Sequence, residues 1–271
     1  MRRIMFYAPH AEKQVEANMQ IITFANSKGG AGKSTALMAL ASALEATGKT
    51  VVVADLDDQG TLASWLAAND GTYRLPDENA LSVRQIYFSE NDQTNADKTQ
   101  EALMEIEKED PDFLLVDTKG KSSHTSAMAM SAADRVICPT NGDSGEYEPV
   151  AQTFANLSAS LNLIAPDDDP LEFFRIMFTK SLVATGKEVL EARQALRENF
   201  TCYNGLPHLT SYNTAHFYGT TLNGLLEKAE ADLAKKGKDA LKRDRNQVAK
   251  LERAVEASTK FMNELLEDLN Q

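Results

Sequence analysis

Glycines and lysines crowd one short run near the start of the chain, Ser27-Lys28-Gly29-Gly30-Ala31-Gly32-Lys33-Ser34-Thr35. Glycine lets the backbone take positive φ and bring its N–H groups close to a phosphate. In such a loop Lys33 would reach the β- and γ-phosphates, and the Ser34 hydroxyl would bind Mg²⁺. The run therefore predicts a loop that binds the phosphates of a nucleotide. The predicted nucleotide-binding residues of this loop are Lys28, Gly29, Gly30, Ala31, Gly32, Lys33, Ser34 and Thr35.

Three aspartates follow apolar runs of the kind that form buried strands. Asp55 and Asp57 follow the run that begins at residue 50, and Asp117 follows Phe113-Leu114-Leu115-Val116. Such carboxylates can bind a Mg²⁺-coordinated water or orient an attacking water, so we assign Mg²⁺ to Ser34, Asp55 and Asp117. Without a phosphate loop nearby, the same aspartates would simply begin turns or cap helices.

The elements that must position these residues alternate between strand-like and helix-like patterns, which predicts βα units and a parallel sheet. We expect strands at 21–25, 50–55, 113–117, 135–139 and 173–179, with a weaker one at 205–209. We expect helices at 34–47, 61–69, 96–108, 123–133, 148–161, 187–200 and 222–235. Residues 70–98 are polar and rich in turn formers, which favours surface loops. Ligands of such sheets lie beyond the carboxyl ends of the strands, where the loop and the three aspartates would meet.

The last part of the chain carries a different pattern. Apolar residues recur in steps of three and four from about 239 to 269, without Pro or Gly, which predicts one long amphipathic helix. That helix either packs back on the domain or serves association. We therefore predict an α/β P-loop NTPase with a mostly parallel twisted sheet, helices on both faces and a long C-terminal amphipathic helix. Its expected parts are an N-terminal extension (1–19), the ATPase domain (20–235) and the C-terminal helix (236–271).

The additional lysine at the start of the loop, Lys28, makes the run resemble the deviant Walker A loop of the ParA/MinD family of ATPases. This resemblance covers roughly residues 20–225 and implies an ATP-dependent homodimer in which Lys28 reaches the partner's nucleotide. Asp55-Leu56-Asp57-Asp58-Gln59 resembles the family's DxDPQ motif, whose second aspartate positions the hydrolytic water. The resemblance thus implies catalytic roles for Lys28, Lys33 and Asp57, with ATP and Mg²⁺ as cofactors.

Two positions depart from the family pattern. Asp58 stands where the family usually has proline, and Lys119-Gly120-Lys121-Ser122-Ser123 replaces the two prolines that usually follow the aspartate corresponding to Asp117. The glycine–serine version is similar to a ParA-like subgroup associated with conjugative and T-DNA transfer. Because the first 20 residues are too few for a DNA-binding helix-turn-helix domain, the resemblance implies the short ParA-like form of the family, which lacks that N-terminal domain.

The base-binding region is indicated by weaker sequence features. Thr179 and Lys180 follow an expected strand, and Pro207 lies in the next turn; both places resemble those where ParA relatives contact adenine. Ordinary turns at strand ends explain these residues equally well. The chain contains no NKxD string, which favours ATP over GTP.

The formal net charge of −12 argues against a globally basic nucleic-acid binder. Residues 235–253, however, hold eight basic side chains against three acidic ones. Such a segment is either a DNA contact or a solvated helix face with i,i+4 pairs. A surface built from Lys180, Lys187 and Arg193 is a further possibility. The predicted DNA-binding residues are Lys235, Lys236, Lys242, Arg243 and Arg245.

The leading functional hypothesis is a ParA-like ATPase that binds nonspecific DNA as an ATP sandwich dimer and drives plasmid partitioning or cargo positioning. The alternative is an ATPase accessory of conjugative DNA transfer that recruits a relaxase complex. A ParB-like or relaxosome-type protein would be the partner. A MinD-like membrane switch is disfavoured because the final residues are acidic. The first 20 residues lack the apolar core of a signal peptide, so we expect a cytoplasmic, nucleoid-associated protein without membrane contact.

Overall fold

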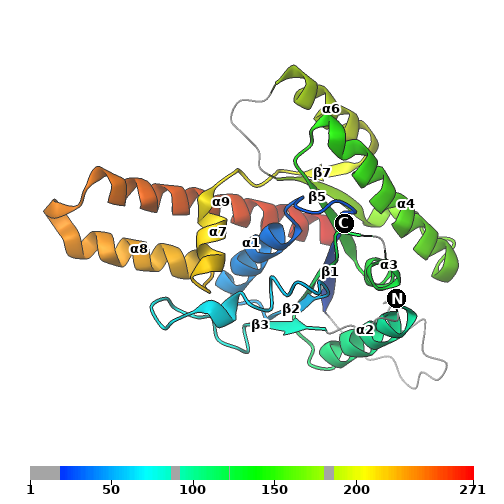
Figure 1. The fold of residues 1–271 in the computed structure, drawn as a ribbon, viewed down its shortest axis with the longest axis horizontal. Helices are drawn as coiled ribbons and strands as arrows, with labels where there is room; N and C mark the ends of the chain where they lie inside the picture. Colours follow the sequence, from blue (N-terminus) through cyan, green and yellow to red (C-terminus); the bar gives the residue numbers. More distant parts are fainter. Residues whose placement is uncertain (1–18, 87–91, 122, 180–185) are drawn as a thin grey trace.

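The computed structural model describes residues 19–86, 92–121, 123–179 and 186–271. Its centre is a seven-stranded sheet in the order β3-β2-β4-β1-β5-β6-β7, in which every pair of neighbours is parallel. This arrangement confirms the predicted fold class (Figure 1). The strands are β1 (Gln20–Phe24), β2 (Val51–Asp55), β3 (Leu81–Gln85), β4 (Phe113–Asp117), β5 (Arg135–Thr140), β6 (Phe174–Phe178) and β7 (Thr201–Tyr203).

Helices cover both faces of the sheet. On one face α1, α7, α8 and α9 close a core with the side chains of alternate strand residues, and on the other face α2, α3, α4 and α6 close a second core. The apolar run Val51, Val52 and Val53 supplies both cores, because successive strand residues point to opposite faces. The helices are α1 (Lys33–Ala46), α2 (Asp92–Glu107), α3 (His124–Ser131), α4 (Tyr147–Ile164), α5 (Pro170–Phe173), α6 (Lys187–Asn199), α7 (Thr210–Phe217), α8 (Leu222–Lys236) and α9 (Lys242–Leu269).

The long C-terminal helix α9 runs antiparallel to α8 and then continues onto the domain (Figure 1). Its buried residues include Leu251, Phe261 and Leu265, which join the core formed around α1. The tip of the α8–α9 hairpin lies away from the sheet, whereas the end of α9 returns to it. The predicted amphipathic helix is therefore present and packs on the domain along its C-terminal part.

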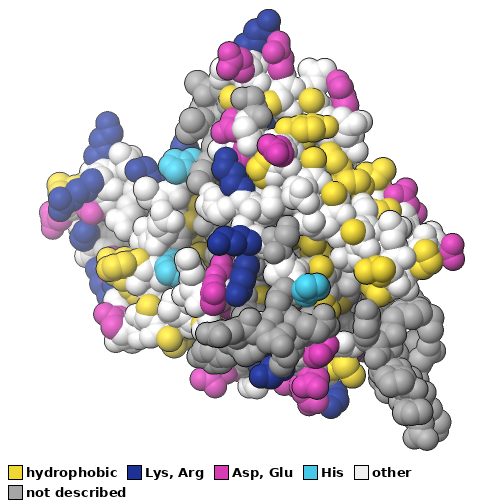
Figure 2. All heavy atoms as spheres, turned by 45° about the vertical axis from the view of Figure 1, so that its right-hand side comes forward, with side chains coloured by type: hydrophobic (Ala, Val, Ile, Leu, Met, Phe, Trp, Pro, Cys, Tyr) yellow, Lys and Arg dark blue, Asp and Glu magenta, His cyan; other side chains and the backbone are white. Residues whose placement is uncertain are grey.

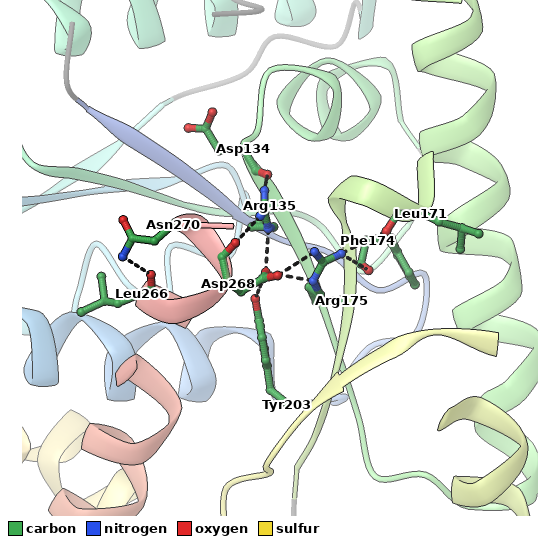
Figure 3. Close-up of polar contacts among 9 residues, drawn as sticks. All are labelled: Asp134, Arg135, Leu171, Phe174, Arg175, Tyr203, Leu266, Asp268 and Asn270. Carbon is green, nitrogen blue, oxygen red and sulfur yellow. Dashed lines mark hydrogen bonds and ion pairs between the residues drawn. The ribbon is translucent and has the colours of Figure 1, made fainter. Parts of the chain in front are cut away.

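The end of α9 is anchored by Asp268 (Figure 3). Its carboxylate accepts hydrogen bonds from Arg135 at 2.6 Å, from Arg175 at 2.7 and 2.9 Å, and from the Tyr203 hydroxyl at 2.6 Å. These three partners belong to β5, β6 and β7. One side chain thus ties the last turn of the chain to three neighbouring strands.

Some predicted elements differ from the structure. Residues 61–69 form turns with one short 3₁₀ segment, Leu66–Ala68, instead of a helix. Strand β3 lies inside the region expected to be loop, and α7 occupies residues for which the sequence pattern predicts no helix. The prediction of a weak strand at 205–209 is wrong, because the last strand of the sheet is β7, Thr201–Tyr203. Most of the N-terminal extension, 1–19, lies outside the described residues.

Within the described ranges, no helix has the combination of length and apolar composition that a membrane crossing requires.

Candidate nucleotide-binding site

The phosphate loop connects the central strand β1 to α1, at the carboxyl edge of the sheet. Gly30 has φ 74° and Gly32 has φ 97°, so both occupy the left-handed region that the glycines were expected to supply. Gly32 is the N-cap of α1 and offers no side chain to the first amides of the helix. These amides, together with the positive end of the helix dipole, remain available to an anion.

The two lysines of the loop have different surroundings. Lys33 is buried, with 8% exposure, whereas 45% of the Lys28 side chain is exposed. The Lys28 ammonium donates a hydrogen bond to Glu146, a carboxylate that is only 2% exposed. This bond raises the pKa of Lys28 above its ordinary value. Glu146 also accepts a 3.0 Å bond from the Thr140 hydroxyl, so the residue that holds Lys28 is itself fixed to the end of β5.

Ser34 and Asp117 meet directly below the loop. The Ser34 hydroxyl donates a 2.6 Å hydrogen bond to Asp117 Oδ2, while Asp117 Oδ1 is buried without a hydrogen-bond partner among the described residues. Burial raises the pKa of Asp117 to about 7, although the Ser34 bond and the Lys33 charge lower it. A hydroxyl beside a carboxylate with a free buried oxygen fits Mg²⁺, which prefers oxygen ligands and keeps several waters.

Asp55 lies in register beside Asp117 in the sheet, and its side chain is fully buried. Burial raises its pKa, although backbone hydrogen bonds oppose this shift. Its oxygens accept the amide N–H groups of Asp57, Leu62 and Ala63 at 2.9–3.0 Å. The carboxylate therefore organises the loop that follows β2, and its assignment to Mg²⁺ stays a prediction.

Asp57 stands in a turn directly after β2, at the same edge of the sheet as the phosphate loop. Its Oδ1 accepts the Gln59 amide at 3.1 Å, and its carbonyl oxygen accepts the Gly60 amide at 3.0 Å. Gln85, from β3, donates a further bond of 3.1 Å to the same carbonyl oxygen. These hydrogen bonds fix the main chain of Asp57. Its catalytic role stays a prediction.

The loop after β4 packs against the phosphate loop. A Cβ on Gly120 would lie 3.2 Å from the Gly29 backbone, so glycine at this position permits the close approach. The Lys119 ammonium donates a hydrogen bond of 3.2 Å to the carboxylate of Asp58. The two positions that depart from the ParA pattern therefore contact each other and join the loops after β2 and β4.

The residues predicted to contact adenine lie beside the phosphate loop. The Thr179 hydroxyl donates a 2.8 Å bond to the Ala31 carbonyl, which fixes the loop at the end of β6. Leu206, immediately before Pro207, donates its amide to the Phe178 carbonyl at 2.9 Å, so the two predicted segments are neighbours. Lys180 lies outside the described residues.

The predicted DNA-binding residues gather elsewhere, around the tip of the α8–α9 hairpin. Figure 2 shows basic side chains collected at that end of the molecule. Asp244 pairs with Lys236 at 3.0 Å and with Arg243 at 3.9 Å, whereas no ion pair engages Lys242 or Arg245 in the described part of the chain. The structure therefore brings these five residues together, away from the phosphate loop.

Two residues of the site, Glu146 and Gln85, are not indicated by any sequence motif. Glu146 is 118 positions from Lys28, and Gln85 lies in a strand whose sequence resembles a polar loop. The polar contacts of both residues depend on how distant segments pack, which no local spacing encodes.

The parallel sheet, the glycine loop before α1 and the Ser34–Asp117 pair define a P-loop NTPase. The model of the family described as ATPase MipZ matches residues 20–155. The chain belongs to this family of ParA-like ATPases.

Similar proteins agree with this assignment. Protein VirC1 of Rhizobium radiobacter is 34% identical over 125 residues, which cover 45% of this chain and 49% of VirC1. The chromosome-partitioning ATPase Soj of Thermus thermophilus is 31% identical over 157 residues, covering 53% of this chain and 63% of Soj. The chain thus matches between about half and two thirds of the length of these relatives.

A plasmid partition protein from Borrelia burgdorferi bound to AMPPNP has the same fold. Its TM-score is 0.59 at 18% identity, covering 88% of this chain and 97% of that protein. At 18% identity, this comparison shows that the two proteins share a fold and nothing further.

Proposed function

We propose that this chain is an ATP-dependent switch: two copies pair face to face around ATP, hydrolyse it and separate. The position of Lys28 carries the proposal. Lys33 is buried in the loop and serves the nucleotide of its own protomer, whereas Lys28 is half-exposed at the rim and is held by Glu146. A cation placed there is suited to the triphosphate of a facing copy.

The remaining chemistry is positioning and charge neutralisation, which phosphoryl transfer to water requires. Ser34 and Asp117 would hold Mg²⁺, which supplies positive charge to the phosphate oxygens. The amides at the start of α1 bind the phosphates, and Asp57 orients the attacking water. The ATP dimer binds DNA nonspecifically through the basic tip of the α8–α9 hairpin and releases it after hydrolysis.

Such a cycle would drive partitioning of a plasmid or another cargo on the nucleoid, in the cytoplasm. The names of Soj and of the Borrelia protein describe partition, which supports this role. Recruitment of a relaxase complex in DNA transfer is the second candidate. It is favoured by the glycine–serine loop after Asp117 and by the similarity to VirC1. A ParB-like or a relaxosome-type protein, respectively, would stimulate hydrolysis.

The first experiment measures ATPase activity with and without nonspecific DNA, with the oligomeric state followed by light scattering. We expect an ATP-dependent dimer and a slow basal rate that rises with DNA or partner protein. A chain that hydrolyses ATP at the same rate as a monomer would contradict the switch.

Asp57→Ala tests the hydrolytic step. The variant should form the ATP dimer yet hydrolyse about 100-fold more slowly, because a group that orients the attacking water contributes roughly this factor. Asp70→Ala is the matched control, since Asp70 also accepts an amide two residues ahead, from Thr72 at 2.9 Å, but lies outside the site. Unchanged turnover of Asp57→Ala removes this residue from the mechanism.

A further inference from the structure

The turn that carries Asp57 is shaped by a side chain from the neighbouring edge strand. Gln85, the last residue of β3, donates its amide N–H to the Asp57 carbonyl at 3.1 Å. We propose that Gln85 is a positioning residue for hydrolysis, which fixes the main chain of Asp57 and thereby aims its carboxylate. This inference rests on the proposed role of Asp57.

The register of the sheet explains why Gln85 reaches this turn. Gln85 pairs with Asp55 in the parallel β2–β3 ladder, and the next amide, of Ile86, donates to the Asp55 carbonyl at 3.1 Å. Asp57 begins its turn two residues beyond Asp55. The backbone of Gln85 therefore lies beside the end of β2, and its side chain is long enough to reach the turn.

Gly60 completes the fit between Gln85 and the turn. Its φ is +61°, and a Cβ there would lie 2.9 Å from Gln85 Oε1 and 3.0 Å from Nε2. The glycine thus leaves space in which the amide group of Gln85 lies directly against the turn. The Asp57 carbonyl accepts both the Gly60 amide and the Gln85 amide, so the side chain binds the turn where the turn closes.

Other contacts fix the loop at different points. The Asp55 carboxylate, at the end of β2, binds the amides of Asp57, Leu62 and Ala63. Lys119 binds Asp58, but 70% of the Asp58 side chain is exposed, and exposed ion pairs contribute little. Among the described residues, Asp55 at the end of β2 bonds to the amide of Asp57, and Gln85 from the neighbouring strand bonds to its carbonyl.

Loss of the Gln85 bond should affect the chemical step rather than nucleotide binding. The phosphate loop is fixed by the bond from Thr179 to Ala31 and by the close approach of Gly120 to Gly29, whereas Gln85 bonds to the carbonyl of Asp57. The orientation of the Asp57 carboxylate, in contrast, depends on the conformation of the turn. A displacement of about 1 Å in a catalytic group can cost up to roughly 100-fold in rate.

The test compares Gln85→Met, which keeps the length of the side chain but removes its donor, with Arg84→Met on the same strand. Arg84 pairs with the exposed Glu109 at 2.5 and 2.6 Å, away from the Asp57 turn. For Gln85→Met we expect kcat to fall roughly 10- to 100-fold, with KM for ATP and ATP-dependent dimerisation unchanged. Arg84→Met should keep the wild-type kcat. Thermal unfolding of both variants checks that the fold is retained.

A double-variant cycle separates this inference from the proposed function. In the Asp57→Ala background, Gln85→Met should produce no further loss, because a positioning residue has no effect without the residue that it positions. If Asp57→Ala is slow and Gln85→Met has the wild-type kcat, the role of Gln85 is wrong and that of Asp57 stands. If Asp57→Ala hydrolyses ATP normally, the proposed role of Asp57 fails first. Equal loss in Arg84→Met and Gln85→Met would assign the effect to strand stability.

Discussion

At the scale of single residues, the two lysines of the phosphate loop differ in burial and in their ion-pair partners. Lys33 is buried in the loop, whereas the side chain of Lys28 is half-exposed and is paired with Glu146. Glu146 is buried, and its second bond goes to the Thr140 hydroxyl, so its charge depends on Lys28 for compensation. A contact with a facing copy must therefore compete with this pair or include it.

Lys28→Ala should bind ATP with an affinity close to that of the wild type, because the amides of α1 and Lys33 remain. It should not form the ATP dimer, and its turnover should fall to the level of the monomer. Nucleotide titration combined with light scattering measures both properties. Lys33→Ala is the contrasting variant, which should lose ATP binding itself.

The buried carboxylate requires a control for this prediction. Lys28→Ala leaves Glu146 without its cation, which can cost about 1–3 kcal/mol of stability. Lys28→Ala/Glu146→Gln removes the uncompensated charge and should recover stability while still failing to dimerise. Recovery of the dimer together with stability would show that Lys28 acts through folding and not across an interface.

At the scale of helices and strands, the sequence predicted those elements whose patterns are strong. The buried strands β1, β2, β4 and β6 and the helices α1 and α8 appear within a few residues of their expected bounds. Strand β3, Leu81–Gln85, was missed because it lies at the edge of the sheet and resembles a polar loop: Leu81 is buried, but the four residues that follow it are only half-buried. This omission also concealed Gln85.

Tertiary contacts explain two other errors. The helix expected at 61–69 does not form, because the Asp55 carboxylate binds the amides of Leu62 and Ala63 and the Trp65 indole donates to the Thr220 carbonyl at 3.0 Å. The segment at 205–209 bonds to the end of β6 through the Leu206 amide, which donates to the Phe178 carbonyl at 2.9 Å, but it does not continue as a strand. In both cases a long-range contact decides the local conformation.

The anchor of α9 links the charge of Asp268 to the stability of the fold. Burial alone would raise the pKa of Asp268, but hydrogen bonds from Arg175, Arg135 and Tyr203 outweigh it, and the pKa lies below its ordinary value. A lowered pKa means that the ionised carboxylate stabilises the folded state above pH 3.8, the ordinary pKa of aspartate. This contribution is lost as the pH falls through the lower pKa of the folded protein.

Asp268→Asn should therefore reduce the free energy of unfolding by about 2–3 kcal/mol at pH 7, because it leaves two mostly buried guanidinium groups without their anion. The difference from the wild type should begin to shrink below pH 3.8, where Asp268 of the unfolded wild-type chain takes up a proton, and should continue to shrink as the pH falls through the lower pKa of the folded protein. Urea unfolding at several pH values measures both effects. Glu264→Gln is the control on the same helix, since Glu264 contacts Asn204 at an exposed position. A difference that persists undiminished at low pH would contradict the role of the Asp268 charge.

At the scale of the whole molecule, the nucleotide site and the basic hairpin tip occupy separate regions (Figure 1). The net charge of −12 makes most of the surface repel a polyanion, so a DNA helix could approach favourably only at a locally basic region. The tip is such a region, and it is close to the start of α9, whose other end is anchored to the sheet by Asp268. A dimer would present two such tips, which would bind DNA more tightly than one.

Reversing charge at the tip tests whether this surface contacts phosphates. Lys242→Glu/Arg245→Glu should weaken binding of the ATP-bound protein to nonspecific DNA. The slope of log affinity against log salt should fall by about 2 per protomer, because each phosphate that the protein no longer neutralises lowers the slope by roughly one unit. Lys108→Glu/Lys260→Glu changes the net charge equally at exposed positions away from the tip and should leave the slope unchanged. Basal ATPase activity should remain normal in both variants, because neither alters the phosphate loop. Equal weakening by the two pairs would mean that only the total charge matters, and the hairpin tip would then not be the DNA surface.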